Sequence, residues 1–204
     1  MIISFSGLDG SGKTSAAMML VAYCKEKNLK TEYVHLQNFS LFNKFGKILQ
    51  NTAPQAHRRV EDVEFKKKSS FKKEMLAILR KITYLTDVLR FRLKTSFCKK
   101  IFVCDRYFYD LAVQSMYLQM FGKTFVRFYL KIIPQPDLAY FLELSPATSF
   151  ARSQEKDLAF HTIKFREYQR ILQHYSFCII QSKTLPQTKK AILHVFSQFY
   201  RIKE

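Results

Sequence analysis

The segment GLDGSGKT, at residues 7–14, has the residue types and the spacing of a loop that binds phosphate groups. It matches the pattern G-x-x-x-x-G-K-[ST] at Gly7, Gly12, Lys13 and Thr14. The chain has only five glycines, and three of them lie in this segment. Glycine lets the main chain wrap closely around a ligand, so that successive N–H groups point at phosphate oxygens. The lysine adds positive charge at the terminal phosphates, and the threonine hydroxyl is a ligand for Mg²⁺.

A loop of this kind does not by itself distinguish a kinase from an ATPase, a GTPase or a motor. A GTPase is expected to carry an N/T-K-x-D element that reads guanine, and no such tetrapeptide stands late in this chain. We therefore predict ATP and Mg²⁺ as the cofactors. The residues predicted to bind ATP are those of the loop: Gly7, Asp9, Gly10, Ser11, Gly12, Lys13, Thr14 and Ser15.

The segment VCDRYFYD, at residues 103–110, supplies a second group of charged side chains. Asp105 follows an apolar run, where an acidic group beside the loop would organise Mg²⁺, usually through water. Together with Thr14 it forms the predicted metal site. Arg106 would project over the carboxyl edge of the sheet, where ligands gather in open α/β folds, and its planar guanidinium suits a phosphate. The alternative is a surface Asp-Arg pair that only caps the next helix.

Strands and helices are predicted to alternate along the chain. Five short apolar runs rich in β-forming residues predict strands at residues 2–6, 32–36, 101–105, 138–144 and 177–180. Stretches of helical character separate them, at residues 13–27, 71–95, 108–132, 146–152, 158–175 and 187–202. This order predicts an α/β fold, with a parallel sheet covered by helices on both faces. With 204 residues, the chain is expected to form one domain, residues 1–204.

The composition is that of an ordinary globular protein, with 48% hydrophobic and 25% charged residues. No apolar run approaches the roughly 20 residues of a membrane span, and no basic segment precedes the short apolar run at the N-terminus. The four cysteines are widely spaced, which favours reduced thiols over disulfides or a metal site. We expect a cytoplasmic protein without a membrane partner.

The net charge of +18 is unusual and concentrates between residues 57 and 100. Such a charge favours anionic partners, among them nucleotides and nucleic acid. The alternative is that lysine serves only to keep the surface soluble. Residues 37–70 show no clear period, and this region carries the basic cluster KKKSSFKK. This region is either a solvated surface or a loop with a helix that moves.

The order of the motifs resembles that of the thymidylate kinase family of nucleoside monophosphate kinases. The loop GLDGSGKT comes first, then Asp-Arg-Tyr at 105–107, then PDLAYFLELSPATSFARS at 136–153, and the resemblance covers most of the chain. It implies a three-layer P-loop kinase fold with a five-stranded parallel sheet in the order 2-3-1-4-5 and a short lid near residues 152–160. It also implies phosphoryl transfer from ATP to a nucleoside monophosphate, first dTMP, and a homodimer with the aromatic 108–132 helix as its interface.

The resemblance also implies roles for individual residues. Asp9 would approach the deoxyribose 3′-hydroxyl or the acceptor phosphate, and Arg106 would bind that phosphate. Arg152 and Lys156 would lie at the lid. Gly10 stands where some members carry an arginine, so the lid would have to supply the catalytic cation. The implied catalytic residues are Lys13, Arg106, Arg152 and Asp9. The implied substrate-binding residues are Asp9, Arg90, Arg92, Arg106, Tyr109 and Gln114.

Part of the chain departs from the family pattern. After the second strand many members show an arginine, an acidic residue and a proline, whereas this chain reads HLQNFSLFNKFGK. Arg58 or Arg59 would then have to supply the missing phosphate contact. Two alternatives to thymidylate phosphorylation therefore stay open. One is the same scaffold acting on another small acceptor, and the other is a nucleic-acid-binding module that uses ATP as a switch.

Overall fold

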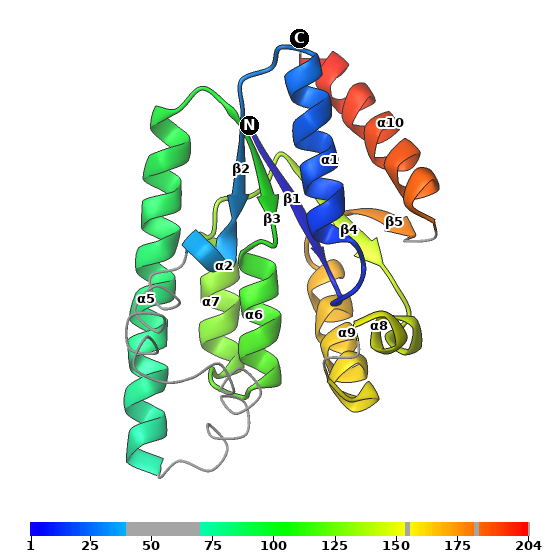
Figure 1. Ribbon diagram of the computed structural model, residues 1–204. Coiled ribbons are helices and arrows are strands. Elements are labelled where there is room, and N and C mark those ends of the chain that lie inside the picture. The colour runs from blue at the N-terminus through cyan, green and yellow to red at the C-terminus, as the bar shows by residue number, and fades with distance from the viewer. Residues whose placement is uncertain (40–69, 154–155, 182–183, 204) are drawn as a thin grey trace, which may run out of the picture.

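The computed structural model describes residues 1–39, 70–153, 156–181 and 184–203. Its five strands form one parallel sheet in the order β2-β3-β1-β4-β5, which confirms the predicted fold (Figure 1). The strands are β1 (Ile2–Gly7), β2 (Thr31–His35), β3 (Ile101–Asp105), β4 (Leu138–Glu143) and β5 (Cys178–Gln181). The helices are α1 (Lys13–Glu26), α2 (Leu36–Phe39), α5 (Ser70–Phe97), α6 (Phe108–Tyr117), α7 (Lys123–Ile132), α8 (Pro146–Ser153), α9 (Leu158–Leu172) and α10 (Leu185–Lys203).

Helices cover both faces of the sheet, which explains why its central strands read as continuous apolar runs. Every residue of β1 and of β3 is buried. Alternate side chains of β3 point to opposite faces, as in any strand: Val103 packs in one core with Leu20 of α1 and Ile192 of α10. Phe102 packs in a second core with Phe91 of α5 and Tyr129 of α7. The molecule therefore has the three predicted layers (Figure 1).

The register of the strands places the loop and the Asp-Arg-Tyr segment at one edge of the sheet. Phe5 of β1 lies opposite Asp105 of β3, and Gly7 lies opposite Leu142 of β4. Because all strands are parallel, their carboxyl ends lie at the same edge. The strand β1 lies between β3 and β4, so the loop that follows it opens between the two halves of the sheet, where ligands bind in such folds.

The prediction of one continuous helix over residues 108–132 was wrong, since two helices occupy this stretch. The helix α6 ends at Tyr117 with Leu118 as its C-cap, and Gln119 takes a left-handed conformation with φ 52°. Gly122 then caps the start of α7. The left-handed residue and the glycine end one helix and reverse the chain, so that α7 packs beside α6.

Two further predictions concern cysteines and membranes. All four cysteines are free, as predicted. Within the described ranges, no helix combines the length and the hydropathy that crossing a bilayer demands. Arg58, Arg59 and most of the unperiodic region 37–70 lie outside the described residues, so the hypotheses about them stay predictions.

Candidate active site

The loop between β1 and α1 passes close to two other elements, which leaves no room for side chains. A Cβ atom at Gly7 would lie 2.6 Å from the carbonyl oxygen of Leu142 in β4. A Cβ atom at Gly10 would lie 3.0 Å from the Cβ atom of Arg152 in α8. Gly12, the N-cap of α1, has φ 86°, a conformation that glycine adopts readily and other residues rarely do. The loop therefore closes over the start of α1 and meets α8.

Lys13 is the first residue of α1, and its side chain folds back over the loop. Its Nζ donates to the carbonyl oxygens of Gly7 (2.9 Å) and Leu8 (2.6 Å), and the residue is 5% exposed. Burial lowers the pKa of this ammonium to about 8, and the nearby positive charge of Arg106 acts in the same direction. The lysine is thus held at the loop by weak acceptors that a triphosphate could replace.

Thr14 and Asp105 meet beside the loop, as the sequence predicted for a metal site. The Thr14 hydroxyl donates to Asp105 Oδ2 at 2.7 Å, and the Tyr33 hydroxyl donates to the same oxygen at 2.8 Å. The other carboxylate oxygen, Asp105 Oδ1, is buried and has no hydrogen-bond partner among the described residues. A hydroxyl and a carboxylate with a spare oxygen are the ligands that Mg²⁺ prefers, so these residues fit the ion.

Asp9 lies between two cations on the other side of the loop. Its Oδ1 is 3.0 Å from Arg106 Nη2, and its Oδ2 is 3.3 Å from Lys164 Nζ. Although burial raises the pKa of Asp9, the charges of Lys164, Lys13 and Arg106 hold it well below its usual range. Arg106 has φ 64°, a left-handed conformation that costs about 1 kcal/mol or more outside glycine. In this conformation the Arg106 N–H donates to the Phe5 carbonyl oxygen (3.1 Å). The guanidinium of Arg106 faces Asp9.

The helices α8 and α9 are tied to the loop by a buried polar network. The Ser149 hydroxyl donates to the main-chain oxygen of Asp9 at 2.6 Å and lies 2.8 Å from His161 Nδ1. The other ring nitrogen, Nε2, lies 3.3 Å from the hydroxyl of Ser153, at the end of α8. His161 is fully buried. The network therefore positions α8, and with it Arg152, over the loop.

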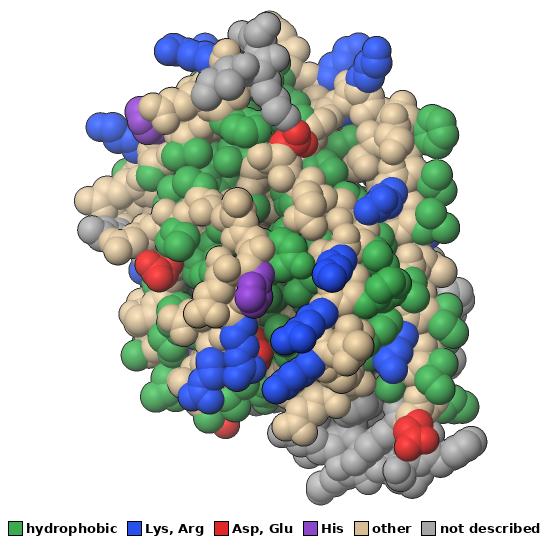
Figure 2. Space-filling model, turned by 180° about the vertical axis from the view of Figure 1, so that it is seen from behind, with side chains coloured by type: hydrophobic (Ala, Val, Ile, Leu, Met, Phe, Trp, Pro, Cys, Tyr) green, Lys and Arg blue, Asp and Glu red, His purple; other side chains and the backbone are tan. Residues whose placement is uncertain are grey.

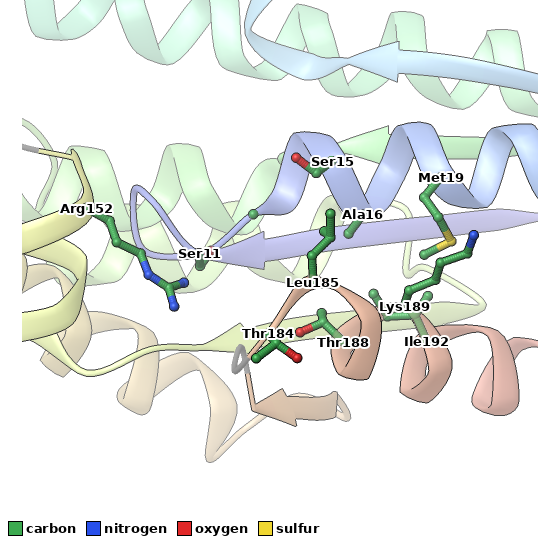
Figure 3. A pocket seen from close by; sticks show the side chains of 11 residues that line it. Ser11, Ser15, Ala16, Met19, Arg152, Thr184, Leu185, Thr188, Lys189 and Ile192 are labelled. Atoms are coloured by element: carbon green, nitrogen blue, oxygen red, sulfur yellow. The ribbon is translucent and has the colours of Figure 1, made fainter.

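Two cavities border the loop. One, of about 360 Å³, is bordered by Asp9, Lys13, Thr14, Arg106 and Arg152, among others. The other, of about 410 Å³, lies between α1 and α10 (Figure 3). Its wall is mostly apolar on the α1 side, while α10 and the residue before it add hydroxyl and ammonium groups. Its lining includes Ala16, Met19, Thr184, Leu185, Thr188 and Lys189. Arg152 borders both cavities and so links them.

The structure brings some of the predicted residues together and leaves others elsewhere. The loop residues, Asp105, Arg106 and Arg152 meet at one place. Tyr109 does not join them, since it is 1% exposed in the core and its hydroxyl donates to Gln135 (2.9 Å). Arg92 turns away as well, because it donates to the carbonyl oxygen of Ile132 (2.7 Å) at the end of α7.

Arg90 and Gln114 border neither of the two cavities. Arg90 stacks on the ring of Phe39 at 4.7 Å and bonds Asp87 (3.2 Å). Gln114 is a half-buried residue of α6. Lys156 packs 5.7 Å from the ring centre of Phe160 and does not border these cavities either.

Sequence reasoning missed Lys164, Ser149 and His161. The only sequence signal for Lys164 and His161 is their spacing of three residues in a predicted helix, which puts them on one face. The same face carries Phe160, Tyr168 and Ile171, so the pattern looks like an ordinary buried stripe.

A comparison with protein families decides what kind of protein this geometry belongs to. The family model for thymidylate kinase matches residues 5–192. The chain belongs to the thymidylate kinase family. This membership supports nucleotide monophosphate kinase activity, and thus a phosphotransferase. A search among individual curated proteins finds no significant match.

The lowered pKa of Lys13 predicts how ATP binding depends on pH. Below pH 8 the ammonium is charged and attracts the triphosphate, whereas above its pKa of about 8 it is neutral. We expect the apparent Kd for Mg·ATP, measured by calorimetry between pH 6.5 and 9.5, to rise by up to about tenfold per pH unit above 8. In Lys13→Arg the guanidinium stays charged, so this rise should vanish. A wild-type Kd that is flat to pH 9.5 would show that Lys13 does not titrate in this way.

Proposed function

We propose that this protein transfers the γ-phosphoryl group of Mg·ATP to a nucleoside monophosphate, with dTMP as the first candidate. The observation that carries the proposal is the 360 Å³ cavity at the loop. Lys13 and Thr14 line one part of it, while Arg106 and Arg152 line another. Such a cavity can hold a triphosphate end and an acceptor phosphate next to each other. Family membership supports the choice of dTMP.

The chain's own residues would do four things in this reaction. The 410 Å³ cavity between α1 and α10 would take the base and sugar of ATP, with Leu185 against the base. Main-chain N–H groups of the loop and the helix start would hold the phosphates. Lys13 and Arg152 would neutralise charge that spreads over the transferred group, and Arg106 would hold the acceptor phosphate.

The chemical step is an in-line displacement. An oxygen of the acceptor phosphate attacks the γ-phosphorus, the bond to the β,γ-bridging oxygen breaks, and ADP leaves. Thr14 and Asp105 would hold Mg²⁺, which would supply charge neutralisation to the phosphates. Because α8 and α9 cover the loop, their docking would exclude water, which otherwise would accept the phosphoryl group.

The four free cysteines support a cytoplasmic location.

The first test is a panel of acceptors scored by ADP release with Mg·ATP. We expect dTMP to give the highest kcat/KM among nucleoside monophosphates and nucleosides. Lys13→Ala serves as the blank, because loss of this charge should lower turnover at least about a hundredfold. The panel includes single-stranded DNA and RNA. Hydrolysis stimulated by nucleic acid, without phosphorylation of any small acceptor, would replace the kinase with an ATP-switched binding module.

A second test concerns the acceptor side of the cavity. Arg106→Ala should raise the KM for the acceptor by about tenfold or more, since it removes a charged contact. The KM for ATP should change by less than about threefold. The matched control is Arg127→Ala, which removes the same charge from an exposed position on α7. If both variants kept wild-type acceptor kinetics, Arg106 would have no part in holding the acceptor.

We also propose a homodimer, with its interface on α5 instead of the 108–132 segment. Buried residues dominate α6, whereas α5 exposes a stripe of large apolar side chains, each about half exposed or more. These residues, here called the α5 stripe, are Met75, Ile78, Leu79, Ile82, Leu89, Leu93 and Phe97. Figure 2 shows hydrophobic side chains running down the edge of the molecule where α5 lies, with Lys and Arg side chains beside them.

The α5 stripe is nearly symmetric about Thr86. Leu79 and Leu93 both stand seven residues from this threonine, and Met75 and Phe97 both stand eleven residues from it. Two α5 helices that cross antiparallel at Thr86 would therefore place Leu79 of one copy opposite Leu93 of the other, and Met75 opposite Phe97. This is the self-complementary pattern that a two-fold interface requires. The exposed Glu74 of one copy would lie near exposed lysines that follow Phe97 in the other.

Sedimentation velocity tests the dimer. The wild-type protein at about 10 μM should sediment with twice the mass of the 24.2 kDa chain, because a stable dimer remains associated at that concentration. Placing two charges in the stripe, in Leu79→Glu with Leu93→Glu, should give a monomer. Met18→Glu, on the exposed side of α1, is the control and should remain dimeric. A monomeric wild type, or a dimeric stripe variant, would contradict the proposed interface.

A further inference from the structure

Lys164 is buried next to the loop, and the sequence did not predict it there. Lys164 lies on α9, its side chain is 8% exposed, and its ammonium lies 4.5 Å from the ring centre of Phe160. Burying a charge costs free energy unless a partner compensates for it. The Lys164 ammonium donates a hydrogen bond to Asp9 Oδ2, at 3.3 Å. The lysine therefore depends on the same carboxylate that faces Arg106.

The Asp9 carboxylate is divided between two cations. Oδ1 accepts one hydrogen bond from Arg106 Nη2 at 3.0 Å, and Oδ2 accepts one from Lys164. An arginine alone with a carboxylate commonly binds both oxygens through a pair of parallel hydrogen bonds. Here Lys164 binds the second oxygen, and Arg106 is joined to Asp9 by one hydrogen bond. Much of the guanidinium's bonding capacity is therefore left for another anion.

The charges around Asp9 do not balance. Three cations, Lys13, Arg106 and Lys164, act on this one carboxylate. The charge of Asp110 also acts on all three cations. Its own hydrogen bonds come from neutral groups, namely the Ser6 hydroxyl (2.8 Å), the Tyr107 N–H (2.7 Å) and the Tyr168 hydroxyl (2.6 Å), so two carboxylates face three cations. An excess of positive charge in a partly buried place favours an anionic ligand over a neutral one.

We infer that Lys164 is a positioning residue that draws Asp9 away from Arg106, so that Arg106 stays available for an acceptor that carries a phosphate. The inference rests on the proposed phosphoryl transfer and narrows its acceptor to phosphorylated compounds, as opposed to free hydroxyl acceptors. Lys164 acts through Asp9, because it does not border the 360 Å³ cavity. The main chain of Asp9 is held as well, by the Ser149 hydroxyl at 2.6 Å.

The charge states of these groups support this arrangement. Burial lowers the pKa of Lys164, and the charge of Asp9 opposes that effect. Burial also lowers the pKa of Arg106, but the carboxylates of Asp9 and Asp110 outweigh it and raise the pKa overall. With the pKa of Asp9 held well below its usual range, the carboxylate remains ionised at neutral pH. It is therefore a resident anion with which a phosphate must compete for Arg106.

The experiment measures binding of inorganic phosphate, by calorimetry, to protein saturated with Mg²⁺ and the non-hydrolysable ATP analogue AMP-PNP. The analogue fills the loop, so that phosphate reports on the acceptor side. Lys164→Met should weaken phosphate binding by about tenfold or more, because Asp9 is then free to bind Arg106 with both oxygens. Lys164→Arg keeps the charge and should stay within about threefold of the wild type. Lys131→Met, on the exposed side of α7, is the control and should bind as the wild type does.

A double variant separates this role from a merely structural one. Adding Asp9→Asn to Lys164→Met removes the competing carboxylate and should restore phosphate binding to within about threefold of the wild type. A fold weakened by loss of Lys164 would not recover in this way. Asp9→Asn alone should bind phosphate more tightly than the wild type, and it tests the same idea if Lys164→Met does not fold.

The phosphate-binding results test the role of Lys164 separately from the kinase activity that the acceptor panel tests. Unchanged phosphate binding in folded Lys164→Met, no recovery in the double variant, or weaker binding in Asp9→Asn would each overturn the inference. If the phosphate results hold but no nucleoside monophosphate is phosphorylated, the acceptor is another phosphorylated compound. In that case the proposed nucleotide kinase activity fails and the phosphate preference stands.

Discussion

The close approach of one loop to two neighbouring elements is the constraint on which the rest of the structure depends. The main chain at Gly7 touches the end of β4, and at Gly10 it touches the start of the side chain of Arg152 in α8. Because no side chain intervenes, the loop can pass this close to β4 and α8 can dock on it. A single Cβ at either position would push these elements apart, and would move Arg152 away from both cavities that it borders.

The charged groups of this site share their partners and do not form one-to-one ion pairs. Lys13 is held by two carbonyl oxygens, which compensate for its burial only in part, and its pKa falls to about 8. Asp9 is shared by Arg106 and Lys164. Neither arrangement neutralises the cations fully. A site of this kind stays attractive to phosphates, while a fully paired one would have to break its ion pairs before binding them.

Much of the fold could be predicted because its signals are local. The strand at 101–105 is an unbroken apolar run, which a strand buried on both faces must be. The loop at 7–14 carries its chemistry in consecutive residues, so the meeting of Thr14 with Asp105 followed from parallel strands ending at one edge. The break between α6 and α7 was missed, although Gly122 marks it, because the aromatic residues on both sides continue a helical pattern.

The sequence by itself determined the order of strands and helices along the chain, the glycine-rich loop at residues 7–14 and the pair of Thr14 and Asp105, because each depends on residues that are neighbours or on the direction of parallel strands. Only the tertiary structure decided that Tyr109 is a core residue and that Lys164 reaches Asp9, 155 positions away. Periodicity tells which face of a helix a residue occupies. It does not tell what packs against that face, and a buried lysine in an apolar stripe acquires its role only from the carboxylate that the fold brings to it.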